Sequence, residues 1–179
     1  VNREGKGYGA WGETHLYLRP VDLATGFGEM TTLDDDPDWL KDQPALAVID
    51  TGDAVVLWSR QKIFDFVPKV VASYRPAGGA WSAPLLLQDP GYIHEYPEAC
   101  LDNEGNAVLT WVATGPSVYV VTYTKAGGWS RTSRLFTATA PDTVTNAQAA
   151  ISGGNAYVVW ATQNSSGKQQ LFGTHAPLP

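Results

Sequence analysis

The residues of this chain best suited to chemistry are a histidine and a glutamate flanked by tyrosines, in the segment QDPGYIHEY. A neighbouring imidazole and carboxylate can act as an acid and a base, and tyrosine rings can form the floor of a glycan site. The sequence contains no Ser-His-Asp order, Gly-rich phosphate loop or HExxH motif that would support catalysis. We therefore predict no catalytic residues and keep four candidates for ligand binding, Tyr92, His94, Glu95 and Tyr96. The alternative, which we favour, is a surface loop with its aromatic side chains folded down.

A further candidate for ligand binding is Trp39, which stands in the acidic segment DDDPDWLKDQ. An exposed indole beside carboxylates can stack on the apolar face of a sugar or contact an ammonium group. Trp39 lies outside the tryptophan positions that repeat along the chain, so repeat packing does not account for it. The sequence leaves open an alternative in which Trp39 caps the edge of a sheet.

The same acidic segment offers carboxylates for Ca²⁺, a cation that binds oxygen ligands. The candidate ligands are Asp34, Asp36 and Asp38. They lack the spacing of an EF-hand loop, and the side chains of consecutive residues point in alternating directions. The sequence therefore favours a solvated acidic loop over a calcium site, and it predicts no other cofactor.

One seven-residue motif recurs along the chain, and the elements that contain it must position the candidate residues. Glycine opens the motif and tryptophan closes it, at intervals of about 50 residues. The copies are GDAVVLW (52–58), GNAVLTW (105–111), GNAYVVW (154–160) and the looser GKGYGAW (5–11). A repeat of this length that holds four short strands is typical of a β-propeller blade.

Each repeat has the order strand, Gly turn, strand, polar loop, strand, Gly-Gly turn, strand. Val, Ile, Tyr and Trp dominate the strands, and Gly, Asn, Asp and Pro separate them. In the second strand, Trp58 points to one face and Leu57 to the other, so both faces are apolar. Sheets packed between two neighbouring sheets require this pattern, whereas a two-sheet sandwich leaves one face polar. We predict an all-β propeller of four-stranded antiparallel blades, with Trp58, Trp111 and Trp160 buried between blades and Trp11 less so.

About four blades are predicted, spanning 1–36, 37–90, 91–140 and 141–179, and the first and last are incomplete. The first lacks its first strand and the last lacks its fourth, so the expected strand count is three, four, four and three. Propeller rings normally pair strands from both termini in one blade, because open edges invite pairing with other chains. We consider three explanations: an excerpt or nicked product of a longer propeller, a four-bladed ring with imperfect ends, and two copies that complete a larger ring.

Two Gly-Gly turns, AGGAWS (77–82) and AGGWSR (126–131), lie between the third and fourth strands of their repeats. At this place the chain resembles sialidase-like BNR propellers, which carry an Asp-box there, roughly S-x-D-x-G-x-x-W. Trp81 and Trp129 match the box, but its Ser and Asp are missing. The resemblance implies the propeller fold of degenerate bacterial extracellular repeats. It implies no activity, because the Asp-box of those families is a folding element on the face away from the active site.

The composition excludes several classes of partner. A net charge of -6 at pH 7 and a pI near 4.9 argue against nucleic acid and anionic membranes, since either needs a basic face. No apolar run is long enough for membrane insertion. Cys100 is the single cysteine, so it forms no disulfide within the chain, and we interpret it as a small core residue. So few cysteines fit a secreted or periplasmic protein.

Propeller ligands usually bind on the face that carries the loops between consecutive blades. We expect a non-catalytic, lectin-like extracellular recognition or scaffold propeller that binds a neutral glycan on this loop face. One alternative is the partial propeller of a sialidase-like glycoside hydrolase or another propeller enzyme. The other is a structural propeller whose partner is a protein. The missing catalytic constellation argues against the enzyme, whereas the incomplete end blades favour both alternatives over a self-contained lectin.

Overall fold

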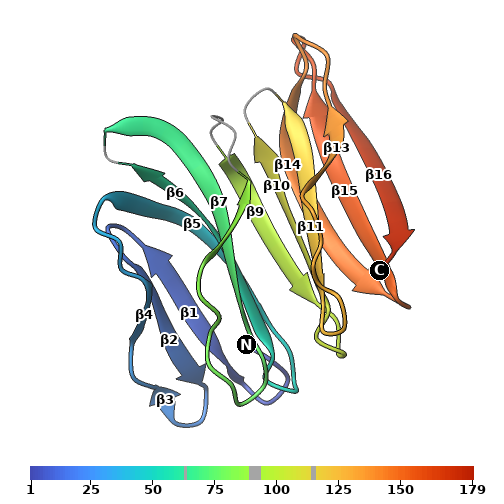
Figure 1. Cartoon of the computed structure of the whole chain (residues 1–179). Coiled ribbons are helices and arrows are strands. Elements are labelled where there is room, and N and C mark those ends of the chain that lie inside the picture. The colour runs from blue at the N-terminus through green and yellow to red at the C-terminus, as the bar shows by residue number, and fades with distance from the viewer. Residues whose placement is uncertain (63, 89–93, 114–115) are drawn as a thin grey trace.

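The computed structural model describes residues 1–62, 64–88, 94–113 and 116–179, and the side chains of 65–67, 88, 94 and 95 lie outside the description. Every regular element in these ranges is a β-strand. The strands form four antiparallel sheets that follow one another in chain order (Figure 1). The prediction of an all-β fold made of consecutive antiparallel blades is confirmed.

The four sheets are numbered here in chain order. Sheet 1 contains β1 (Lys6–Gly12), β2 (Leu16–Asp22), β3 (Gly26–Phe27) and β4 (Thr31–Asp34). Sheet 2 contains β5 (Trp39–Val48), β6 (Ala54–Lys62), β7 (Asp65–Arg75) and β8 (Leu85–Gln88). Sheet 3 contains β9 (His94–Leu101), β10 (Ala107–Ala113), β11 (Ser117–Thr124), β12 (Gly128–Trp129) and β13 (Ser133–Thr137). Sheet 4 contains β14 (Thr143–Ser152), β15 (Asn155–Gln163) and β16 (Gln169–Pro177).

Short strands share the outer position of two sheets. Strands β3 and β4 both pair with β2, and strands β12 and β13 both pair with β11. Counted by position, the sheets therefore have three, four, four and three strands, as expected from the repeats. Sheet 1 begins with the second strand of the repeat, and sheet 4 ends with the third.

Tight glycine turns join the first two strands of the repeats. Gly52 and Gly105 have φ angles of 95° and 84°, a backbone conformation that favours glycine. Their N–H groups donate to the carbonyls of Ile49 and Asp102, at 2.9 and 3.0 Å. Because adjacent strands run antiparallel, these turns share one end of the sheets with the hairpins that follow β2, β7 and β11. We call this the turn end, and the opposite end, where consecutive sheets are joined, the loop end.

Apolar side chains fill the space between each pair of neighbouring sheets. Trp58 packs with Leu16 between sheets 1 and 2, Trp111 packs between sheets 2 and 3, and Trp160 packs between sheets 3 and 4. Trp58 and Trp111 are fully buried and Trp160 is 7% exposed, whereas Trp11 is 42% exposed. The predicted burial of the repeated tryptophans is confirmed, and Trp11 differs because no sheet of the described chain packs on its face.

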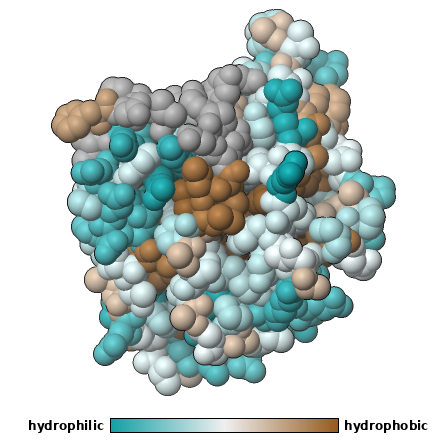
Figure 2. All heavy atoms as spheres, in the orientation of Figure 1, coloured by the Kyte–Doolittle hydropathy of each residue, from teal (hydrophilic) through white to brown (hydrophobic). Residues whose placement is uncertain are grey.

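Sheets 1 and 4 lie at the two ends of the row of sheets (Figure 1). Each of the two inner sheets is thus covered on both faces, which explains why both faces of β6 and β10 are apolar. On the side seen in Figure 2, hydrophobic residues form separate patches among hydrophilic ones. Cys100 packs against the core between sheets 3 and 4, and burial raises the pKa of its thiol to about 11, as suits a core residue.

Candidate functional site

Trp39 lies at the loop end, where it begins β5, and it is 8% exposed. Three cationic side chains surround its indole. The guanidinium carbon of Arg60 is 4.7 Å from the ring centroid, and the Nζ atoms of Lys62 and Lys69 are each 5.5 Å from it. The expectation of an exposed indole is therefore wrong, because the pairing of β5 with β6 and of β6 with β7 brings these long side chains over the ring. A role of Trp39 in ligand binding stays a proposal.

The carboxylate of Asp34 is buried beside Trp39, and cations of the chain itself neutralise it. It accepts a hydrogen bond from Trp58 Nε1 at 3.2 Å and lies 3.5 Å from Lys41 Nζ and 3.6 Å from Arg60 Nη1. The Lys41 ammonium also donates to the carbonyls of Thr14 and Trp39, both at 2.8 Å, and to that of Asp36. Backbone carbonyl oxygens and the Asp34 carboxylate thus hold the Lys41 ammonium in a buried position.

Asp34 and Asp36 also serve as acceptors in the turn of this segment. The side chains of Asp34 and Asp36 accept the backbone N–H groups of Asp36 and Asp38 at 3.4 and 3.2 Å. The described residues contain no group of three or more side chains placed to hold a metal ion. Calcium binding by Asp34, Asp36 and Asp38 stays an untested prediction.

The four remaining candidates belong to the start of β9 and the segment before it. Tyr92 lies outside the described residues, and only the backbones of His94 and Glu95 are described. Tyr96 is 47% exposed and has a φ of 52°. Its strand is bulged there, and Gln43 has a φ of 47° at the corresponding bulge of β5. The unusual backbone therefore belongs to the repeat rather than to a site.

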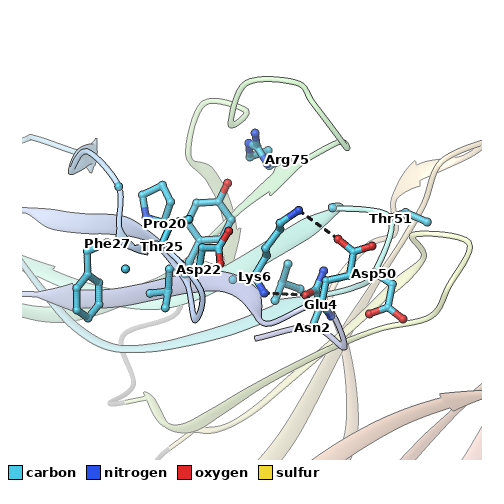
Figure 3. Close-up of a pocket in the computed structure, with 17 residues that line it drawn as sticks. Asn2, Glu4, Lys6, Pro20, Asp22, Thr25, Phe27, Asp50, Thr51 and Arg75 are labelled. Atoms are coloured by element: carbon cyan, nitrogen blue, oxygen red, sulfur yellow. Dashed lines mark hydrogen bonds and ion pairs between the residues drawn. The ribbon is translucent and has the colours of Figure 1, made fainter.

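A cavity of about 500 Å³ opens at the turn end, between sheets 1 and 2 (Figure 3). Its lining comes from the chain start, the hairpin after β2 and the turn between β5 and β6. Tyr8 contributes an aromatic ring, and charged and polar side chains stand beside it, among them Glu4, Lys6, Asp22, Asp50, Thr51 and Arg75. The ring of Phe27 points to the opposite face of sheet 1, where the guanidinium of Arg19 lies over it (Figure 3). Sequence reasoning missed this cavity, because its residues come from separate segments with no common motif.

The charges around this turn-end cavity are largely paired within the protein. Lys6 Nζ lies 3.2 Å from Glu4 Oε2. Asp50 accepts the backbone N–H of Arg3 at 2.8 Å and lies 3.6 Å from its Nε. The guanidinium carbon of Arg75 stands 5.6 Å from the centroid of a tyrosine ring. Paired charges beside an aromatic ring suit an uncharged molecule with many hydroxyl groups better than an ion.

A second group of ionisable residues is closed to ligands. Asp53 is fully buried and accepts hydrogen bonds from Thr51 Oγ1 at 2.7 Å and Lys125 Nζ at 3.0 Å. The Tyr74 hydroxyl lies 2.8 Å from Asp53 and 3.0 Å from the carbonyl oxygen of Gly105. Burial raises the pKa of the Asp53 carboxyl, but these hydrogen bonds outweigh burial and hold the pKa below its usual value. The group joins sheet 2 to sheet 3.

No protein-family model and no curated protein matches the chain, but several solved structures are similar to it. A thermostable family-43 glycoside hydrolase is 12% identical, with 97% of this chain and 70% of that chain covered and a TM-score of 0.48. An endo-arabinase from Bacteroides thetaiotaomicron is 13% identical, with 96% and 74% covered and a TM-score of 0.45. A PL25 ulvan lyase bound to -[GlcA(1-4)Rha3S]- is 11% identical, with 89% and 49% covered and a TM-score of 0.50.

These similarities concern the fold. The chain spans about half the length of the ulvan lyase chain and a larger share of the other two. Within the described residues, no helix is long and apolar enough to cross a membrane. Four consecutive antiparallel sheets, in which the repeated tryptophan of each later sheet packs on the sheet before it, make this chain an all-β protein of the propeller type.

Proposed function

We propose that this protein is a non-catalytic recognition propeller that binds a neutral carbohydrate in the turn-end cavity. The observation that carries the proposal is the cavity lining, in which the Tyr8 ring stands beside both hydrogen-bond donors and acceptors. A sugar ring has an apolar face that stacks on aromatic rings and hydroxyl groups that donate and accept. A volume of about 500 Å³ also falls in the range of small-ligand sites.

The charge of the cavity supports a neutral ligand. Glu4, Asp22 and Asp50 contribute three carboxylates, and Lys6 and Arg75 contribute two cations. An ionic ligand would have to compete with the ion pair of Glu4 and Lys6 and with that of Asp50 and Arg3. Sugar hydroxyls can bind to the same groups without separating them.

The loop end is a second proposed location for the ligand. Its candidates are Trp39, Tyr92, His94, Glu95 and Tyr96. Side chains are described for two of these candidates, Trp39 and Tyr96, and Tyr96 is the more accessible, at 47% exposure.

We also propose that the protein is secreted or periplasmic, where it would meet extracellular glycans. The similarity of the Gly-Gly turns to degenerate sialidase-like BNR repeats supports this location.

A carbohydrate-active enzyme is the alternative function. The ulvan lyase that shares the fold holds a sulfated, glucuronate-containing repeat, and this chain covers 49% of it. An active site could then depend on parts of a larger propeller. This alternative predicts turnover, and it favours anionic polysaccharides as substrates.

Ligand-observed NMR with a panel of neutral oligosaccharides and one sulfated glucuronate–rhamnose oligosaccharide tests the binding proposal, followed by calorimetric titration of the hits. We expect a neutral sugar to bind. Tyr8→Ala should weaken that binding by about 3- to 10-fold, the value of one aromatic contact. Leu23→Ala is the matched control, because Leu23 is 73% exposed in the hairpin that borders the cavity but does not line it.

Further outcomes separate the alternatives. Weaker binding by Tyr96→Ala with Tyr8→Ala unchanged would move the site to the loop end. Binding of the anionic oligosaccharide alone would contradict a neutral ligand. Shortened or unsaturated products after long incubation would replace the recognition function by an enzymatic one.

A further inference from the structure

The two end faces of the row of sheets resemble the faces that pack inside it, yet no described sheet covers them. On sheet 1, the face turned away from sheet 2 exposes 42% of Trp11, whereas its repeat equivalents Trp58 and Trp111 are fully buried. On sheet 4, the face turned away from sheet 3 exposes 39% of Tyr157 and 43% of Val159. Trp11 and Val159 are thus partly exposed at repeat positions that are buried elsewhere in the chain. Such exposure of large apolar side chains indicates that another surface packs on these faces.

The outer face of sheet 1 has the same kind of residues as the faces that pack against a preceding sheet. Trp11 pairs with Tyr17 across β1 and β2, with ring centroids 5.7 Å apart. In sheet 3 the same pair, Trp111 and Tyr119, has centroids 5.8 Å apart and packs on sheet 2. Beside Trp11, nothing lies within 4 Å of the point where a side chain on Gly9 would begin. The face thus offers aromatic rings and an open space.

The outer face of sheet 4 has the same kind of residues as the faces that pack against a following sheet. Tyr157 and Val159 are the repeat equivalents of Val55 and Leu57, which are fully buried against sheet 3. His175 stacks on Tyr157 with ring centroids 5.5 Å apart. Strands β14, β15 and β16 contain no Asp, Glu, Lys or Arg. An uncharged sheet face loses little hydration when it is covered.

We propose that two copies of this 179-residue chain associate head to tail. The outer face of sheet 4 of one copy packs on the outer face of sheet 1 of the other. Inside the chain, every inter-sheet contact joins these same two types of face, so the ends complement each other and not themselves. Two such contacts, related by a twofold axis, would close a ring of eight sheets, a size that propellers reach.

Sedimentation velocity over about 1 to 100 μM protein tests the association. We expect the wild type to sediment at twice the chain mass of 19.3 kDa. Val159→Arg should raise the dissociation constant by about 100-fold or more, because it buries a charge without a partner. Leu171→Arg is the second variant on this face, and with Leu171 78% exposed it does not threaten folding. Leu40→Arg is the matched control, since Leu40 is 42% exposed but belongs to sheet 2.

Mixing two variants tests the head-to-tail geometry. Trp11→Arg should also be monomeric, because it alters the other face. A mixture of Trp11→Arg and Val159→Arg keeps one pair of unaltered faces, so it should form mixed pairs that neither variant forms alone. Far-ultraviolet circular dichroism of each variant checks that the sheets are intact.

Three results would overturn the proposal. A wild type that stays monomeric throughout this range would leave the end faces to a different partner. Dimers that survive both Val159→Arg and Leu171→Arg would place the contact elsewhere. A mixture of the two arginine variants without mixed pairs would contradict the pairing of unlike faces. None of these results would bear on carbohydrate binding, which is measured on the monomer as well.

Discussion

Replacing Tyr74 by Phe removes one hydroxyl from the interface between sheets 2 and 3 and leaves the ring in place. The hydroxyl lies 2.8 Å from Asp53 Oδ1 and 3.0 Å from the carbonyl oxygen of Gly105. The ring stacks on Tyr123 with centroids 4.2 Å apart, a contact that Phe keeps. Asp53 is fully buried and Tyr74 is 4% exposed, so water does not replace the lost donor.

The size of the effect follows from the charge of the acceptor. A hydrogen bond to an ionised group contributes about 1.5–3 kcal/mol. Thr51 and Lys125 still donate to Asp53 in the variant, so the carboxylate keeps partners. We therefore expect Tyr74→Phe to lower the free energy of unfolding by about 2 kcal/mol at pH 7.

The effect should depend on pH in a defined direction. Burial raises the pKa of Asp53, but its hydrogen bonds lower it further, so the folded pKa lies below the unfolded value. The stabilisation from the ionised carboxyl is therefore complete above the unfolded pKa, at about 3.9, and is lost as the pH falls through the lower folded pKa. A neutral hydrogen bond contributes about 1 kcal/mol, so the difference between wild type and Tyr74→Phe should shrink by about half in acid.

Urea unfolding followed by tryptophan fluorescence, at pH 7 and in steps down to the lowest pH at which the protein still folds, measures both effects. Tyr119→Phe is the control, because Tyr119 stacks on Trp111 but its hydroxyl has no hydrogen-bond partner in the part of the chain described here. That variant should be nearly neutral. A loss below about 0.5 kcal/mol for Tyr74→Phe, or an equal loss at both ends of the pH range, would refute the reasoning.

The remaining predictions concern packing and buried charge. Trp111→Ala should cost about 3–5 kcal/mol in urea unfolding, because it empties a fully buried position. Trp11→Ala, measured in dilute protein, should cost about 1–2 kcal/mol, because 42% of this side chain is already exposed. Lys41→Met should cost about 3–5 kcal/mol in the same assay, because it leaves Asp34 and the surrounding carbonyls without the ammonium. Equal losses for the two tryptophans, or a neutral Lys41→Met, would contradict these assignments.

The architecture could be predicted from the sequence because it depends on short-range patterns. Alternation along β6 places Trp58 on one face and Leu57 on the other, and both are fully buried. Glycine marks the turns at Gly52 and Gly105, where φ is positive. Such patterns depend on residues one or two positions apart, and they recur in several copies of the repeat.

The candidate site could not be predicted in the same way. Trp39 was expected in an exposed loop, but β5 extends to it and Arg60 lies across its ring. The cavity at the turn end brings Tyr8, Asp50 and Arg75 together, and no motif in the sequence links these three residues.

The sequence by itself thus determined the strand order, the apolar faces and the incomplete end sheets. These features follow from local periodicity, which backbone geometry translates directly into sheets. Only the tertiary structure decided which polar residues meet and which aromatic side chains stay accessible. Lys41 donates to the carbonyl of Thr14, and Trp11 stays partly exposed while Trp58 is buried. Both outcomes depend on how one whole sheet packs on the next.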